Sequence, residues 1–332
     1  MMQQSVQGQR SQQGDLAVEA RGLVKLFGDN RAVDGVDLLI PIGCIYALLG
    51  PNGAGKTTII NMLTTLLKPD GGSAKIFGHD VASETQVVRQ LISVTGQSAA
   101  VDERLSATEN LTIFGMLLGL SRSQANKRAA ELLTEFGLED AANRTLDKFS
   151  GGMRRRLDLA SSLIIQAPLI FLDEPTTGLD PRTRVQMWES IRRMVATGST
   201  ILLTTQYLDE ADQLADRIAV MDHGRVVAEG TPRELKSTVG RATLNLRLAN
   251  EKDAPEAARI AEEVLHVKAS QPEGQLVTAP MSDPDKVTDL LVALRNAKIH
   301  LATVSVQDPT LDEVFLALTG DGKEHPDGGN DA

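Results

Sequence analysis

After a polar start, the chain contains three segments in which apolar residues either alternate with polar ones or run without interruption. They span residues 16–27, 31–40 and 44–50. Alternation is typical of half-buried strands, and the continuous run CIYALLG is typical of a buried strand that stops at a glycine. We therefore predict a sheet that leads directly into a glycine-rich loop.

The apolar positions change to a helical period from Ser106 onward. Ser106 and Glu109 have the spacing of a capping box before one apolar run, and Ser121 with Gln124 repeats it before the next. A capping box satisfies backbone amides at the start of a helix, so this spacing marks where each helix begins. We predict a helical insert over residues 98–149.

Strand-like and helix-like segments then alternate. LIIQAPLIFLDE contains a second buried strand, Asp180 and Pro181 are suited to begin a helix that runs to about Ala196, and STILLTT is a further strand. RIAVMDHGRVVAEG indicates a hairpin that turns at His223 and Gly224. Alternation of strands with helices predicts an α/β domain over this part of the chain.

The last part of the chain follows a different pattern. Over residues 241–320 we predict a strand, a helix, two strands at 266–270 and 275–279, a second helix, a strand and a final helix. This is the order of a ferredoxin-like split unit, so the second domain is expected to be a small α+β domain. The polar ends, residues 1–15 and 321–332, are expected to be disordered.

Composition and charge narrow the possible partners. The chain has 332 residues, 42% of them hydrophobic, and a formal net charge of -10, with most of the acidic excess beyond residue 240. This charge gives no general attraction to nucleic acid or anionic lipid. The uncharged run 159–172 contains Pro168 and is shorter than the roughly 18–20 residues of a membrane-spanning helix. The start lacks the apolar core of a signal peptide. We expect a cytoplasmic chain without a nucleic-acid partner, for which another chain supplies any membrane pathway.

The loop GPNGAGKT after the third strand has the phosphate-binding spacing Gly-x-x-x-x-Gly-Lys-Thr. Its glycines let backbone amides converge on phosphate oxygens, and the start of the next helix adds positive potential. We expect Lys56 to reach the β and γ phosphates and the Thr57 hydroxyl to bind magnesium. The residues expected to contact the nucleotide here are Gly50, Pro51, Asn52, Gly53, Ala54, Gly55, Lys56, Thr57 and Thr58.

The segment LIFLDEP delivers two acidic residues to the end of a buried strand. We expect Asp173 to hold magnesium through water and Glu174 to orient or deprotonate the water that attacks the phosphate. An acidic pair in such a place is often only a cap for the next helix. The phosphate-binding loop elsewhere in the chain favours the catalytic interpretation.

A second anion site is predicted at the start of another helix. Ser150, Gly151 and Gly152 precede a segment with helically spaced leucines, so the helix N-terminus can attract phosphate. Because this site is separate from the phosphate-binding loop, its anion can belong to a nucleotide held by a second molecule.

With these motifs in this order, residues 16–240 resemble the ATP-binding cassette family. The resemblance implies a P-loop cassette with a mixed sheet core, an antiparallel β subdomain and a helical subdomain, using ATP and Mg²⁺. GPNGAGKTT is then the Walker A loop, LIFLDE the Walker B strand, FSGGM a variant of the LSGGQ signature, and TGLD, ending at Asp180, the D-loop. Gln97 is the Q-loop residue, with roles in catalysis and metal binding. Phe27 would stack on adenine, although the residues alone explain it almost as well as a core aromatic.

The resemblance also implies a homodimer in which Ser150 and Gly152 of one copy close over ATP held by Lys56 of the other. VTGQSAAVDERLSATENL, FSGGMRRRLDLA, LLTTQYLDEADQLADRI and PTLDEVFLALTG are similar to the daunorubicin-resistance type of ATPase subunit. This type implies drug or antibiotic efflux through a separate integral membrane permease, which holds the ATPase at the cytoplasmic face of the membrane. The alternatives are an exporter of a lipid or cell-envelope precursor and a soluble cassette ATPase without a transport role.

Two positions depart from the common cassette pattern. Met153 ends the signature where many members have glutamine, and the arginines 154–156 follow it. Because helical neighbours point in different directions, we expect these arginines to form a solvated, partly paired face. Gln206 stands where most relatives have the switch histidine. An amide donates and accepts hydrogen bonds but does not titrate near neutral pH. We therefore expect Gln206 to position and sense the γ-phosphate, with Glu174 as the base.

Overall fold

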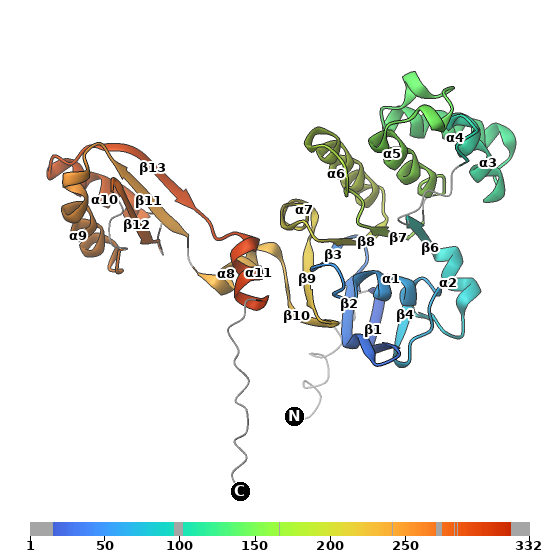
Figure 1. The fold of residues 1–332 in the computed structure, drawn as a ribbon, viewed down its shortest axis with the longest axis horizontal. Helices are drawn as coiled ribbons and strands as arrows, with labels where there is room; N and C mark the ends of the chain where they lie inside the picture. Colours follow the sequence, from blue (N-terminus) through green and yellow to red (C-terminus); the bar gives the residue numbers. More distant parts are fainter. Residues whose placement is uncertain are drawn as a thin grey trace, which may run out of the picture. The chain divides into compact units, whose positions relative to one another are not determined.

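The computed structural model describes residues 16–95, 102–165, 167–240, 242–269, 274–281, 283 and 285–319. The chain divides into two compact units, one up to Pro232 and one from Arg233 onward (Figure 1). Each unit has its own cluster of buried apolar residues. The contacts divide the chain after the first residue of helix α8 (Pro232–Val239), whereas the change in sequence pattern placed the boundary just after this helix, at residue 240.

The first unit is built around a six-stranded sheet with the order β10-β9-β3-β8-β7-β6. Neighbouring strands run parallel except β10, which forms the predicted hairpin with β9. The carboxyl ends of the parallel strands therefore meet at one edge, where such sheets bind ligands. The strands are β3 (Ile45–Leu49), β6 (Ile92–Thr95), β7 (Leu169–Asp173), β8 (Thr200–Thr205), β9 (Arg217–Asp222) and β10 (Arg225–Gly230).

A second, four-stranded antiparallel sheet has the order β2-β1-β4-β5. Helix α1 (Lys56–Leu63) contacts β2 and β4 of this sheet and β7 of the first, and apolar residues of all three parts form one core. This arrangement fixes the start of α1 against both sheets. The remaining elements here are β1 (Leu16–Phe27), β2 (Asn30–Pro41), β4 (Gly71–Ile76), β5 (His79–Asp80) and α2 (Thr85–Leu91).

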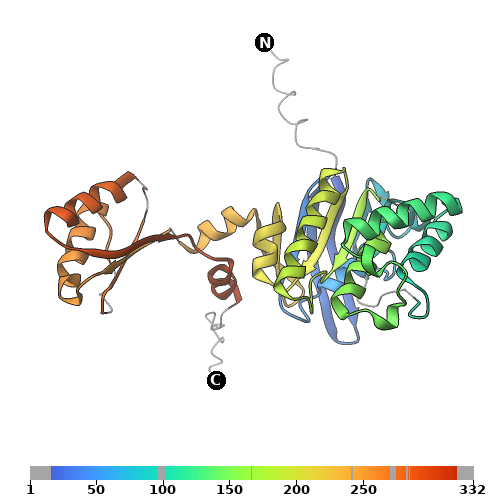
Figure 2. The same ribbon diagram turned by 90° about the horizontal axis from the view of Figure 1, so that it is seen from above.

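The helical insert contains α3 (Ala107–Leu117) and α4 (Arg122–Glu135), which pack on each other and on α5 (Gly151–Ser162). Figure 2 shows these helices together at one end of the first unit. Both predicted capping boxes are present at the starts of α3 and α4. Short 3-10 turns at 139–141 and 146–148 connect α4 to α5. Among the described helices, none is both long and apolar enough to cross a membrane.

Two further helices of the first unit lie on either side of β8 in the sequence. Helix α6 (Pro181–Ala196) begins and ends where the sequence predicts, with Asp180 as its N-cap. Helix α7 (Leu208–Leu214) follows β8 directly. Both helices contact β8.

The second unit contains a three-stranded sheet with the order β12-β11-β13, in which β11 is antiparallel to both neighbours. Strands β12 and β13 thus run parallel with β11 between them, which is the split arrangement of a ferredoxin-like unit. The elements are β11 (Thr243–Leu248), a 3-10 turn (Glu251–Asp253), α9 (Ala254–Leu265), β12 (Leu276–Pro280), α10 (Asp285–Asn296), β13 (Leu301–Gln307) and α11 (Leu311–Thr319).

The strand predicted at residues 266–270 is wrong over its described part, residues 266–269. His266 ends α9 in the left-handed conformation, with a φ of 54°, which turns the chain away from an extended path. The amide of Ala269 then donates to the Glu262 carboxylate on α9, at 3.1 Å, instead of to a strand. The segment thus folds back on the helix that precedes it.

Candidate functional site

The phosphate-binding loop connects β3 to α1 at the carboxyl edge of the parallel sheet. Two of its glycines, Gly50 and Gly55, are required by close backbone contacts. A Cβ atom on Gly50 would lie 2.4 Å from the carbonyl oxygen of Met221, and one on Gly55, whose φ is 99°, would lie 2.4 Å from that of Ala32. Only glycine accepts both the positive φ and the close approach. The loop is therefore held between β2 and the end of β9.

Lys56 begins α1 and its side chain is buried. Its Nζ donates to the carbonyl oxygens of Gly50 (2.7 Å) and Pro51 (3.0 Å) and lies 3.9 Å from Glu174 Oε1. Burial lowers the pKa of Lys56, and the nearby carboxylates of Glu174 and Asp173 oppose that shift. A cation at the mouth of the loop is suited to contact phosphate oxygens.

Asp173, at the end of β7, lies at the centre of the site and is buried. Its carboxylate accepts hydrogen bonds from Thr57 Oγ1 (3.2 and 3.1 Å to the two oxygens) and from Thr204 Oγ1 (2.5 Å). Thr57 belongs to the first turn of α1 and Thr204 to β8, so three elements meet here. Hydroxyl and carboxylate oxygens are the ligands that Mg²⁺ prefers, so this set fits that ion.

Glu174 follows in a conformation that side chains rarely adopt, with a φ of 47°. Its amide donates to the carbonyl oxygen (3.2 Å) and Oγ1 (3.1 Å) of Thr204. Its carboxylate accepts a hydrogen bond from Thr177 Oγ1 at 3.2 Å. The turn thus directs the Glu174 carboxylate to the same side of the sheet as Lys56.

Gln206 comes directly after β8 and is half-buried. Strand β8 pairs with β3, and the amide of Gly50 donates to the carbonyl oxygen of Thr205 at 3.2 Å. The backbone of Gln206 is therefore next to the start of the phosphate-binding loop. The structure brings together predicted site residues from three segments far apart in the sequence: the loop 50–58, Asp173 with Glu174, and Gln206.

The second predicted anion site lies at the start of α5. Ser150 is its N-cap, and the Ser150 Oγ accepts a hydrogen bond from the amide of Met153 at 3.3 Å. A Cβ atom on Gly152 would have Leu179 as its nearest neighbour, at 3.7 Å. Among the described residues, no hydrogen bond or ion pair joins residues 150–152 to the phosphate-binding loop. Within one chain the two sites remain separate.

The sequence comparisons identify the family. An ABC transporter family model matches residues 33–177, and a model described as "ATP-binding protein DrrA1-3-like, C-terminal domain" matches residues 230–319. The chain is 55% identical over 307 residues to the daunorubicin/doxorubicin resistance ATP-binding protein DrrA of Streptomyces peucetius, covering 92% of both chains. The chain belongs to the ABC transporter family. As predicted, it is the ATP-hydrolysing subunit of an ABC exporter.

Other relatives and solved structures agree with this assignment. The doxorubicin resistance ATP-binding protein DrrA of Mycobacterium tuberculosis is 46% identical, with 93% of this chain and 96% of the relative covered. The Nod factor export ATP-binding protein I of Rhizobium sp. is 36% identical, with 92% and 97% covered. The solved ATP-binding subunit of an ABC transporter is 29% identical, with a TM-score of 0.61 over 67% of this chain and 92% of that one. The predicted cassette fold is confirmed.

Three further predicted site residues of this ABC ATPase are Phe27, Asp180 and Gln97. Phe27, at the end of β1, is 51% exposed, which excludes the core-aromatic interpretation. Lys25 Nζ lies 5.8 Å from the centre of its ring. Asp180 caps α6 by accepting hydrogen bonds from the amides of Arg182 and Thr183, both at 3.1 Å. Gln97 lies outside the described residues.

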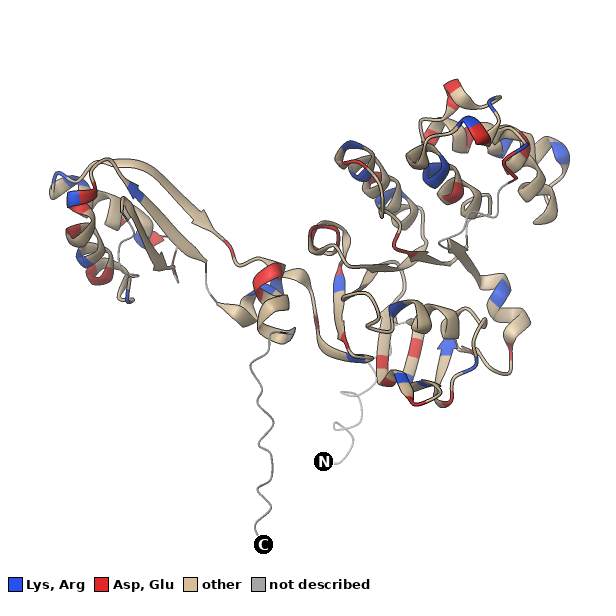
Figure 3. Cartoon of the chain, in the orientation of Figure 1, with Lys and Arg blue, Asp and Glu red and all other residues tan. Residues whose placement is uncertain are grey.

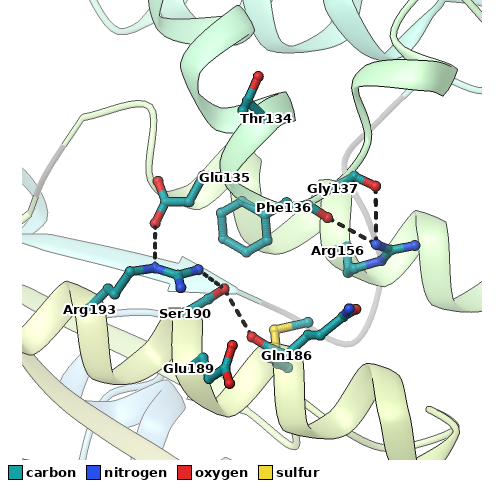
Figure 4. A pocket seen from close by; sticks show the side chains of 10 residues that line it. Thr134, Glu135, Phe136, Gly137, Arg156, Gln186, Glu189, Ser190 and Arg193 are labelled. Atoms are coloured by element: carbon teal, nitrogen blue, oxygen red, sulfur yellow. Dashed lines mark hydrogen bonds and ion pairs between the residues drawn. The ribbon is translucent and has the colours of Figure 1, made fainter.

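Of the arginines that follow the signature, Arg154 matches the predicted solvated, partly paired face, whereas the side chain of Arg155 is only 15% exposed. Arg154 Nη1 pairs with Glu103 Oε1 at 2.5 Å. Arg156 Nη1 donates to the carbonyl oxygens of Phe136 (3.0 Å) and Gly137 (3.2 Å) at the end of α4, beside a cavity of about 200 Å³ (Figure 4). Figure 3 marks both basic and acidic residues along α4, α5 and α6, and the sequences of these helices hold more basic than acidic residues.

Arg155 contacts the site, and the sequence motifs do not predict this contact. Its guanidinium donates to backbone carbonyl oxygens at the end of β7, beside Glu174. Carbonyl acceptors leave no mark in the sequence, because every residue carries one. One local feature could have indicated this contact. Arg155 lies one turn after the start of α5, on a helix whose first residues are themselves predicted site residues.

Proposed function

We propose that this ATPase works as a homodimer with ATP held between two copies and powers drug or antibiotic efflux through a separate integral membrane permease. The observation that carries the dimer is the separation of the two anion sites within one chain. Lys56 and Asp173 belong to one site, whereas no hydrogen bond or ion pair among the described residues joins Ser150 or Gly152, at the start of α5, to the phosphate-binding loop of that site. A second copy completes the set of groups around each nucleotide.

The drug cargo and the membrane pathway are proposed from the relatives. Several are named as ATP-binding proteins of daunorubicin or doxorubicin resistance, and they match over more than nine-tenths of this chain. As the ATPase subunit of such an exporter, this chain would be held at the cytoplasmic face of the membrane by its permease.

The chain's own residues then have distinct roles at the nucleotide. Lys56 and the loop amides bind the phosphates, and Phe27 stacks on the base. Thr57 and Asp173 would hold a magnesium ion, with Gln97 as a further ligand, and the ion would neutralise charge that develops on the phosphate oxygens. Glu174 orients the attacking water and accepts its proton, and Gln206 hydrogen-bonds near the γ-phosphate.

The decisive experiment replaces Glu174 by glutamine. The amide keeps the size of the side chain but cannot accept the proton, so ATP-bound dimers are expected to accumulate and to elute earlier in size-exclusion chromatography. Glu189→Gln is a matched control, since Glu189 is an exposed glutamate on α6. If Glu174→Gln elutes as a monomer with ATP while the wild type hydrolyses ATP normally, the sandwiched dimer is wrong.

A second cargo class is also considered, because some relatives are named for Nod factor export and not for drug resistance. These relatives are 36% identical to this chain. The alternative cargo class is a lipid or cell-envelope precursor. Purified ATPase reconstituted with its permease distinguishes the two: stimulation of ATP hydrolysis by daunorubicin supports drug efflux, and stimulation by lipid precursors alone supports the alternative.

A further inference from the structure

Arg155 lies on α5, one turn after the residues that begin this helix. Its Nη2 donates to the carbonyl oxygens of Asp173 (2.8 Å) and Glu174 (2.9 Å), and its Nε donates to that of Pro175 (3.1 Å). One planar guanidinium therefore holds three consecutive carbonyl groups. We call residues 173–175 the Walker B turn.

The Walker B turn needs such support. Glu174 has a positive φ of 47°, a conformation that persists only where the surroundings hold it. On one side, Thr204 of β8 accepts the Glu174 amide. On the other side, Arg155 binds the carbonyl groups. The direction of the Glu174 carboxylate thus depends on contacts from β8 and from α5 together.

Arg155 is itself held in place. Its Nη1 lies 3.5 Å from Asp158 Oδ2, one turn further along α5, and the two side chains are only 15% and 9% exposed. Burial raises the pKa of Asp158, and Arg155 counteracts that shift. A partly buried ion pair of this kind fixes the plane of the guanidinium, which a lysine ammonium does not provide.

A cavity of about 480 Å³ adjoins this contact. Its lining includes Gly151, Arg155, Asp158, Glu174 and Leu179. The start of α5 and the catalytic carboxylate therefore face the same hollow, and Arg155 is the described hydrogen-bonding link between them.

We propose that Arg155 is a positioning residue that fixes the Walker B turn to α5 and thereby sets the direction of Glu174. Because α5 begins at Ser150 and Gly152, which the proposed function assigns to the partner copy's ATP, the same side chain couples the two nucleotide sites of the dimer. This second step rests on the proposed homodimer. The first step depends only on the contacts within one chain.

The test compares ATP hydrolysis by Arg155→Lys, Arg155→Met and the wild type. Lysine keeps the positive charge beside Asp158 but not the planar fork, so the variant is expected to fold, with circular dichroism as the check. For both variants kcat should fall by about 10- to 100-fold, because the lost bonds involve a charged donor. The dissociation constant for ATP should stay within about twofold, since Lys56 and its loop are untouched.

Arg154→Met is the matched control, because Arg154 is the adjacent arginine and pairs with the exposed Glu103. Its kcat is expected to equal that of the wild type. The proposal is overturned if Arg155→Lys folds and keeps wild-type kcat, if it loses ATP affinity in parallel with kcat, or if Arg154→Met shows the same loss.

The coupling between sites has its own measurement. The wild-type rate of hydrolysis should depend cooperatively on ATP concentration, and Arg155→Lys should lower the Hill coefficient toward unity. A wild type without cooperativity contradicts the homodimer of the proposed function but leaves the effect of Arg155 on kcat to be judged separately. A cooperative wild type with an equally cooperative Arg155→Lys contradicts the coupling role.

Discussion

Gln206 is the single residue at which this ATPase departs most clearly from the common cassette pattern. It lies between the Walker A loop and the Walker B turn, at the carboxyl edge of the sheet, next to the Gly50–Thr205 hydrogen bond. A neutral amide at this place provides one donor and one acceptor at any physiological pH. We therefore propose that Gln206 contributes to hydrolysis by positioning, independent of proton transfer.

We predict that Gln206→Ala lowers kcat by about tenfold, the effect of losing one hydrogen bond in the transition state. Gln206→His should keep activity, because imidazole also donates and accepts, but it should add an ionisation near pH 6.5 to the pH profile of kcat. Steady-state hydrolysis from acidic to alkaline pH measures both effects. Wild-type turnover in the alanine variant would leave Gln206 with a structural role only.

At the residue scale, the sequence predicts the parts of the site that belong to short motifs. Lys56, Thr57 and Asp173 meet as the motifs imply, because the spacing of each motif fixes its residues on adjoining elements. Arg155 and Thr204 are not predicted, since their partners are far away in the sequence. Such contacts depend on how α5 and β8 pack against the end of β7. The spacing of residues within a short motif does not predict this packing.

At the scale of elements, helix α7 is tied to its neighbours by a buried carboxylate. Glu210, in the first turn of α7, has 0% exposure. It accepts hydrogen bonds from Thr176 Oγ1 (2.8 Å) in the loop after the Walker B turn and from Trp188 Nε1 (3.2 Å) on α6. The segment that follows Gln206 is thus fastened to the segment that follows Glu174.

This burial predicts a pH-dependent stability. Burial raises the pKa of Glu210 above its ordinary value of 4.5. As pH rises from 4.5 toward the raised pKa, the unfolded chain loses the proton first, so this group's contribution to the free energy of unfolding falls. Glutamine does not titrate, so Glu210→Gln lacks this loss. The free energy of unfolding of Glu210→Gln should therefore rise relative to that of the wild type as pH increases, in total by about 1.4 kcal/mol for each unit by which the pKa of Glu210 is raised.

Urea denaturation at a series of pH values measures the difference. The exposed glutamate of α6 again supplies a control, because Glu189→Gln should follow the wild-type curve. A constant difference between Glu210→Gln and the wild type at all pH values would contradict the prediction.

Element boundaries were predicted well where the signal is local. The capping boxes at Ser106 and Ser121 and the N-cap Asp180 lie where the sequence places them, because a cap is formed within a few residues. The strand at 266–270 failed for a different reason. The apolar pattern of this segment suits a strand as well as a segment that folds back. The left-handed conformation of His266 and the hydrogen bond from the Ala269 amide to Glu262 decide for the second.

At the scale of the whole molecule, the two units have separate cores. The apolar cluster of the first unit contains no residue beyond β10, and that of the second contains residues of β11 and later elements. The change of sequence pattern indicates two domains because each domain must bury its own apolar face, and it places the boundary at residue 240. The acidic excess of the second unit gives it no general attraction to anionic lipid.

We predict that a chain ending at Gly240 folds and binds ATP with an affinity within about twofold of that of the full chain. The described nucleotide-site residues and the first core lie before this point, and so do the described partners of Lys56 and Asp173. Fluorescent ATP titration of both chains tests the prediction, with circular dichroism to verify folding. A folded but non-binding short chain would contradict it. A second comparison introduces Glu174→Gln into both the full chain and the shortened chain and measures ATP-driven dimerisation. Weaker dimerisation of the shortened chain means that the removed residues clamp the two copies. Equal dimerisation means that these residues act outside that contact.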